Sequence, residues 1–226
     1  MTTRAPKSPI AGPATDDADD FPTFPLVGPL RLNLAALGVD HSAPDFNERF
    51  FRFANDNYPY TLEHSAQGEL IVMPPTGSDS NKGEQGVNAP LFFWDLDNPG
   101  QAYSQTVMFH LPSGARYMPD ASWIPQERYD NLTASERSSA INGAPDFVIE
   151  VHSRSDSLTS GLAKMQEWMD AGCKLGWYIH PYQRRVYVYR AGREVETLEN
   201  PDSLSGEDVL PGFALEVRRL MFDRYE

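Results

Sequence analysis

Two carboxylates interrupt apolar runs in this sequence, and their positions point to chemistry. Glu150 lies inside the run FVIEV, and Asp120 lies inside YMPDASWI. A carboxylate within a buried strand costs free energy unless a partner compensates its charge. The first question that the sequence raises is therefore which group is the partner of Glu150.

Strand geometry predicts that the two acids meet. Because side chains alternate along a strand, Asp146, Glu150 and His152 share one face of theirs. If Asp120 points inward from a neighbouring strand, two such close carboxylates cannot both ionise comfortably without a cation. Mg²⁺ suits oxygen ligands and keeps the waters needed to hydrolyse a phosphate ester. We therefore expect a magnesium ion between Asp120 and Glu150; the alternative is a buried ion pair of Glu150 with an arginine such as Arg116.

Periodicity and turn signals predict the elements that would hold these residues. Helices are expected at 46–57, 76–98 and 134–139, and after residue 156, where Leu158, Leu162, Met165 and Met169 form an apolar stripe. A β-hairpin is expected at 60–75, and strands at 103–111, 115–125, 146–152, 175–181 and 184–190. From residue 76 the order is helix, three strands, helix, strand, which indicates an α/β or α+β fold with a mixed sheet flanked by helices.

Composition narrows the class of protein. The 226 residues carry a net charge of −13, which argues against broad electrostatic binding of nucleic acid. The sequence has no apolar stretch long enough to cross a membrane, no secretory signal, and one cysteine, Cys173. We expect a cytoplasmic protein with a disordered or irregular extension at 1–29 and one domain at 30–226.

Several motifs occur together in one order: PDASW, PDFVIEV, SRSDSL, KMQEWMDAGCKLGWYIHP and LPGF. Over residues 47–222 the chain resembles the Uma2 family of bacterial restriction endonucleases, within the PD-(D/E)XK nuclease superfamily. The resemblance implies a restriction-endonuclease-like αβββαβ core and hydrolysis of DNA phosphodiester bonds with Mg²⁺ or Mn²⁺. It also implies DNA as substrate and a homodimer.

The resemblance assigns roles to individual residues. Asp120 matches the aspartate of the PD motif and Glu150 the acid of the (D/E)XK motif, so both would bind the metal, together with the carbonyl of Val151. The motif's lysine would fall at His152. In this family a lysine of the following helix, here Lys164, replaces it and would orient or activate the attacking water.

Accessory roles rest on weaker grounds. The superfamily often has a glutamate on its first core helix, for which Glu84 is the nearest candidate and Glu63 the weaker one. Asp146 and His152 are possible accessory residues; the alternatives are an aspartate that starts its strand and bonds the local backbone, and a histidine satisfied at a strand end.

Other interpretations of the whole chain remain open. Lys164 has the simple alternative of a solvated helix lysine. The fold could also persist as a non-catalytic binding or structural module, or act on a substrate other than DNA.

Overall fold

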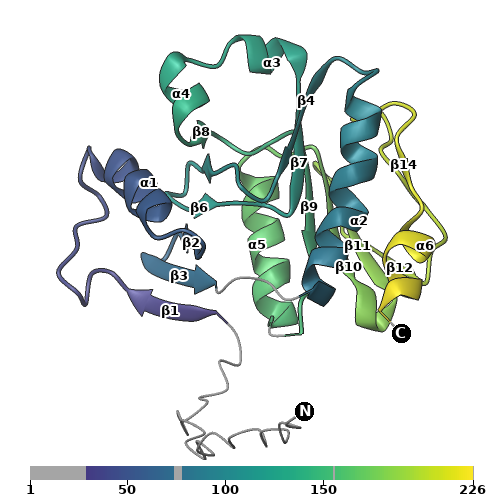
Figure 1. The fold of residues 1–226 in the computed structure, drawn as a ribbon, viewed down its shortest axis with the longest axis horizontal. Helices are drawn as coiled ribbons and strands as arrows, with labels where there is room; N and C mark the ends of the chain where they lie inside the picture. The colour runs from purple at the N-terminus through teal and green to yellow at the C-terminus, as the bar shows by residue number, and fades with distance from the viewer. Residues whose placement is uncertain (1–28, 74–77, 155, 226) are drawn as a thin grey trace, which may run out of the picture.

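The structure is a computed structural model that describes residues 29–73, 78–154 and 156–225. Within these residues the strands form two six-stranded sheets and one two-stranded sheet, with helices packed on them (Figure 1). The extension predicted at 1–29 lies almost wholly outside the described residues. None of the described helices is long and apolar enough to cross a membrane.

The central sheet has the strand order β12-β11-β10-β9-β7-β4. Strand β9 runs parallel to β10 and antiparallel to β7, and β7 pairs antiparallel with β4. The strand bounds are β4 Gly100–Ser104, β7 Ala121–Pro125, β9 Phe147–Val151, β10 Leu175–His180, β11 Arg185–Arg190 and β12 Glu196–Glu199.

Helices cover both faces of this sheet. Helix α2 (Ser78–Asp95) packs Val87 and Leu91 on the face of Ile149, and α5 (Leu158–Asp170) packs Met165 on the face of Val148. Because both faces are covered, β9 reads as a continuous apolar run and not as an alternating one. The order α2-β4-β7-β9-α5-β10 confirms the predicted mixed-sheet core.

The second sheet has the order β1-β3-β2-β6-β5-β8 and is covered by α1 (Phe46–Asp56), whose Phe46 and Phe50 pack on Leu62 and Leu70. Its hairpin, β2 (Thr61–His64) and β3 (Glu69–Met73), confirms the prediction for 60–75. The other strands are β1 Leu30–Asn33, β5 Phe109–His110, β6 Arg116–Tyr117 and β8 Ile141–Asn142.

The remaining described elements are short. Helix α4, predicted at 134–139, is observed at Ala134–Ser138, where Thr133 and Glu136 form a capping box. The others are α3 Gln126–Asp130, η1 Pro181–Gln183, β13 Leu204–Ser205, β14 Ala214–Leu215, α6 Val217–Leu220 and η2 Phe222–Arg224.

Two predicted strands were wrong as single elements. The segment 103–111 divides into the end of β4 and β5, and 115–125 divides into β6 and β7; in each case the two parts belong to different sheets. Pro119 lacks an N–H and cannot donate to a ladder, which favours a break there. The chain crosses between the sheets at this break, and Asp120 stands at the crossing, directly before β7.

Candidate active site

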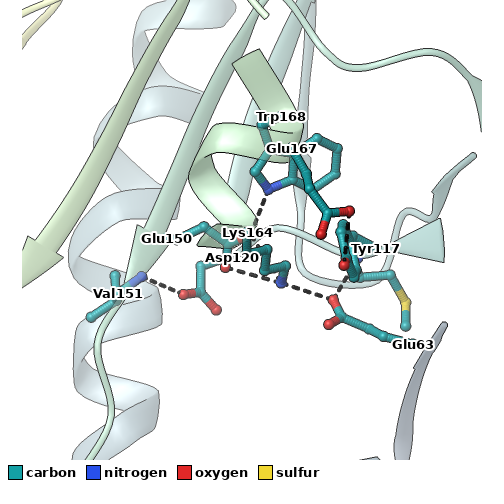
Figure 2. Close-up of polar contacts among 9 residues, drawn as sticks. Glu63, Tyr117, Asp120, Glu150, Val151, Lys164, Glu167 and Trp168 are labelled. Carbon is teal, nitrogen blue, oxygen red and sulfur yellow. Dashed lines mark hydrogen bonds and ion pairs between the residues drawn. The ribbon is translucent and has the colours of Figure 1, made fainter. Parts of the chain in front are cut away.

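Glu150 is compensated by two donors from α5. Lys164 Nζ lies 3.0 Å from Glu150 Oε1 and 3.2 Å from Oε2, and Trp168 Nε1 donates to Oε1 at 2.9 Å (Figure 2). The alternative of an ion pair with Arg116 is wrong. Arg116 is buried elsewhere, over the ring of Phe46 and against the Gly114 carbonyl. In the protein alone, the charge partner of Glu150 is Lys164.

Asp120 faces the same side of the sheet as Glu150. Strands β7 and β9 pair Ala121 with Ile149, and continuing that register by one residue places Asp120 opposite Glu150. The Val151 N–H donates to Asp120 Oδ2 at 2.7 Å, which holds the carboxylate against the end of β9 (Figure 2). The two acids of the sequence motifs are therefore neighbours across one strand pair.

Lys164 lies between two carboxylates and not in bulk solvent. Its Nζ is 2.9 Å from Glu63 Oε1, and its side chain is 20% exposed. Glu63 comes from β2 of the other sheet, and its Oε1 also accepts from the Met118 N–H at 2.8 Å. The reading of Lys164 as a solvated helix lysine is thus wrong. The lysine joins the two sheets at the point where the chain crosses between them.

The electrostatics of the site follow from one ammonium among several acids. Burial, and then the charge of Glu150, raises the pKa of Asp120 well above its usual value. Burial also raises the pKa of Glu150, although Lys164 opposes that shift. For Lys164, burial alone would lower the pKa, but Glu150 and Glu63 outweigh it and raise the pKa above its usual value. The lysine therefore stays an ammonium at neutral pH, while burial is the main cause that raises the pKa values of the two carboxyl groups.

Of the predicted accessory residues, Glu84 acts on Asp120 through its charge. It is buried on α2, accepts from Gln105 Nε2 at 2.6 Å, and its charge contributes to raising the pKa of Asp120. Asn88, one turn later on α2, donates to the carbonyl of Asp120 at 2.8 Å. Glu84 thus belongs to the surroundings of Asp120, whereas Glu63 contacts Lys164 directly.

The other two accessory candidates have different partners. Asp146 precedes β9 at the end opposite to Val151 and pairs with Lys174 at 2.6 Å and Arg128 at 3.3 Å. His152 bonds the Tyr178 hydroxyl through Nδ1 at 2.7 Å and stacks on His180, with ring centroids 3.9 Å apart. These contacts agree with the structural alternatives given for the two residues, a strand-start aspartate and a strand-end histidine.

Three residues of the site were not singled out for it by the sequence analysis. Trp168, expected only as helix core, is buried and also donates to Glu150. Tyr117 lies with its ring 5.1 Å from Lys164 Nζ, and its hydroxyl donates to Glu167 Oε2 at 3.1 Å. Positions 164, 167 and 168 are spaced i, i+3, i+4, so the helical period would have identified this polar face of α5.

The donor set fits a magnesium ion better than a closed zinc site. Among the residues that the structure describes, no group of three His, Cys, Asp or Glu side chains is arranged to hold a metal. A structural zinc site requires four such ligands, whereas Mg²⁺ is commonly bound by one or two carboxylates, with waters and phosphate oxygens as its other ligands. Asp120 and Glu150 are oxygen donors whose pKa values are raised first by burial, and a hard divalent cation would stabilise their charged forms.

The fold is a mixed α/β arrangement of two mixed sheets and helices. It is similar to the crystal structure of a "putative nuclease belonging to DUF820" from Anabaena variabilis, with a TM-score of 0.62 and 20% sequence identity over 74% of this chain and 92% of that one. The chain belongs to the Uma2 family, whose model is described as "putative restriction endonuclease" and matches residues 47–218. A search of the curated proteins gave no match.

Proposed function

We propose that this protein is a Mg²⁺-dependent endonuclease that hydrolyses phosphodiester bonds of DNA. The observation that carries the proposal is the position of the Lys164 ammonium, 3.0 Å from Glu150 beside the strand pair that presents Asp120. A purely structural domain has no need of a lysine held between two buried carboxylates at a sheet crossing. Membership of a restriction-endonuclease family supports the same reaction.

The metal-binding role is assigned to Asp120, Glu150 and the carbonyl of Val151. A bound Mg²⁺ would polarise the phosphate and supply a water of lowered pKa. The Val151 N–H fixes the orientation of the Asp120 carboxylate, and Trp168 does the same for Glu150. These two bonds position the acids before any ligand arrives, so less reorganisation remains for the reaction.

Lys164 acts as a hydrogen-bond donor and not as a base. Its pKa lies above the usual lysine value because Glu150 and Glu63 outweigh its burial, so it retains its proton at neutral pH. An ammonium held there can orient the attacking water through that water's lone pair and can stabilise the negative charge that grows on the phosphate oxygens. Glu63 restrains the lysine from the opposite side.

The proposal extends to a cytoplasmic homodimer, which the resemblance to the family implies. Exposed apolar side chains near the end of α2, namely Phe92, Phe93 and Leu96, are compatible with a contact between copies. The mass of the protein in solution, measured by light scattering, tests this part.

One observation favours a second candidate, a non-catalytic binding or structural module that keeps the nuclease fold. Both oxygens of Glu150 already have protein donors, so the site is partly satisfied without a metal. The net charge of −13 also weakens non-specific attraction to DNA.

A cleavage assay separates the two. Purified protein is incubated with plasmid and linear DNA in Mg²⁺ or Mn²⁺. We expect the wild type to nick the plasmid, and Asp120→Asn and Lys164→Met to lose the activity. Lys174→Met is the matched control, because Lys174 also pairs with an acid but lies 61% exposed at the other end of β9. A wild type that binds DNA but cuts no form of it in Mn²⁺ would be the binding module.

A further inference from the structure

A cluster of aromatic rings and one guanidinium borders the proposed active site. Tyr182 follows β10 in the turn η1, and the Arg154 guanidinium lies over its ring at 4.7 Å. Tyr225, near the end of the chain, meets Tyr182 edge to face at 5.3 Å. Arg154 is exposed and both tyrosines are partly exposed, so an external ligand can reach the cluster.

The topology places this cluster next to the acids. Arg154 and Tyr182 follow the carboxyl ends of the parallel strands β9 and β10, the edge at which α/β sheets usually bind ligands. The Tyr225 hydroxyl lies against the backbone of Gly83 on α2, where an added methyl group would overlap it and would also touch Val151. Tyr225 therefore lies close to the side chain of Val151, the residue whose carbonyl is a proposed metal ligand.

Electrostatics agree with that position. The pKa of Tyr225 is raised to about 12, by burial first, then by Tyr182, and then by the carboxylates of Asp120 and Glu84. The phenol thus lies within the field of the acids and keeps its proton. It remains a hydrogen-bond donor at any physiological pH.

The chemistry of the cluster favours an unpaired DNA strand over a duplex. Binding to duplex DNA rests on several cations that neutralise successive phosphates, whereas this cluster offers a single guanidinium on a chain of net charge −13. An arginine stacked on a tyrosine presents a flat cationic surface, and flat aromatic and guanidinium surfaces bind bases whose faces are free. Bases within a duplex do not expose their faces.

We propose that Arg154, Tyr182 and Tyr225 form the binding surface for an unpaired DNA strand beside the scissile phosphate. Arg154 contacts a phosphate or stacks on a base, the two tyrosines receive the neighbouring base and sugar, and the Tyr225 hydroxyl donates to a phosphate oxygen. The inference deepens the proposed function, on which it rests. It names unpaired DNA, such as a single strand or a frayed end, as the preferred substrate.

Binding by a non-cleaving parent tests the inference. In the Asp120→Asn background with Mg²⁺, fluorescence anisotropy measures the affinity for a labelled oligothymidine and for a blunt duplex of the same strand length. We expect tighter binding of the oligothymidine. Arg154→Ala and Tyr182→Ala should each weaken it about fivefold or more, the effect of losing one stacked base. Tyr182→Phe, which keeps the ring, should retain it.

A second arginine–tyrosine contact, away from the site, is the control for the loss of one positive charge. The Arg137 guanidinium lies over the ring of Tyr129 at 4.5 Å, in the α3–α4 region, so Arg137→Ala removes the same kind of contact at a site without the proposed role. It should leave oligothymidine binding unchanged. Thermal melting reports whether each variant folds, and exposed Arg154 keeps the test valid if Tyr182→Ala does not fold.

Several results would overturn the inference. They are equal affinity of the parent for the two probes, no binding of either, full binding by Arg154→Ala, or an equal loss in Arg137→Ala. The binding assay uses a parent that does not cut DNA. A wild type without cleavage activity would therefore contradict the proposed nuclease function but would leave the binding measurement valid. Cleavage with no loss in the Arg154 and Tyr182 variants would reject the binding surface alone.

Discussion

At the scale of single residues, the arrangement around Lys164 is a buried ion-pair network. Its ammonium contacts Glu150 and Glu63, whose side chains are 11% and 3% exposed. Removing one partner of such a network leaves the remaining charges buried and uncompensated, which costs more than the pair itself contributes.

Lys164→Met should therefore destabilise the fold strongly. We expect a loss of about 3 kcal/mol in the free energy of unfolding, measured by urea denaturation. Lys174→Met is the control; its side chain is 61% exposed, so a loss below about 1 kcal/mol is expected. Equal losses in the two variants would show that Lys164 is no more than a surface lysine.

Asp120 makes stability depend on pH in an unusual direction. Burial and the charge of Glu150 raise its pKa in the folded state above the usual value of 3.8, so the folded protein binds the proton more tightly than the unfolded chain. Between the usual pKa of 3.8 and the raised pKa of the folded state, the free energy of unfolding therefore falls as pH rises. With divalent ions removed by EDTA, Asp120→Asn should therefore have a higher melting temperature than the wild type. The difference should grow as pH rises from the usual pKa of Asp120 to its raised pKa, and should be constant above the raised pKa. Melting curves over a pH series measure this, and a margin independent of pH would contradict it.

The sequence predicted part of this site for physical reasons. Glu150 and Asp120 stand out because carboxylates are rare within buried strands, whereas Lys164 was named through the resemblance to the family. Glu63 could be named only as a weak candidate. Its contact with Lys164 joins two sheets across 101 residues of chain, and no local pattern reports such a contact.

At the scale of elements, α5 must lie close to the sheet for Lys164 to reach Glu150. Gly161 makes this approach possible, because a Cβ at that position would overlap the ring and hydroxyl of Tyr178 on β10. The Tyr178 hydroxyl oxygen and two carbons of its ring lie too close to such a Cβ. The hydroxyl is also hydrogen-bonded to His152 Nδ1 at 2.7 Å. The ring therefore cannot turn aside without loss.

Gly161→Ala should lower both stability and activity. Overpacking of this kind costs about 1–3 kcal/mol, which exceeds the gain of about 1 kcal/mol that alanine brings to a helix. Ser160→Ala, at an exposed position of the same turn, is the control and should be neutral or slightly stabilising. Denaturation and cleavage assays check both variants. A Gly161→Ala protein as stable as the wild type would mean that α5 does not depend on this close approach.

The elements also show where prediction from sequence stops. Helices α1 and α5 and the hairpin β2–β3 follow periodicity and turn signals, so their positions were predicted well. The segments 103–111 and 115–125 have continuous strand-like composition, yet each is shared between two sheets. Composition reports that a residue is extended and buried, but the sheet to which it belongs is decided by tertiary packing.

At the scale of the whole molecule, the net charge of −13 bears on metal binding as well as on DNA. An acidic chain attracts divalent cations at many surface carboxylates, so stabilisation by Mg²⁺ alone does not locate a site. The proposed site differs from that surface, because the fold holds Asp120 and Glu150 together. When both are charged and no cation is bound, the two carboxylates repel each other.

Millimolar Mg²⁺ or Mn²⁺ should therefore raise the melting temperature of the wild type through these two acids. A ligand that binds only the folded state stabilises it by about 2.7 kcal/mol at a hundredfold excess over its dissociation constant. Glu150→Gln should abolish the rise, since it removes the charge and keeps the volume. Lys164→Met should retain the rise although its stability is lower, because the lysine is not a metal ligand.

Glu199→Gln is the matched control for the surface, since Glu199 is 62% exposed and pairs with Arg185 at 2.6 Å. It removes one carboxylate from the same acidic chain and should leave the metal-induced rise intact. If the rise persisted unchanged in Glu150→Gln, the ion would bind among the surface carboxylates, and the assignment of Asp120 and Glu150 as metal ligands would be lost. If it disappeared in Glu150→Gln and persisted in Glu199→Gln, the strand pair β7–β9 would be the metal site.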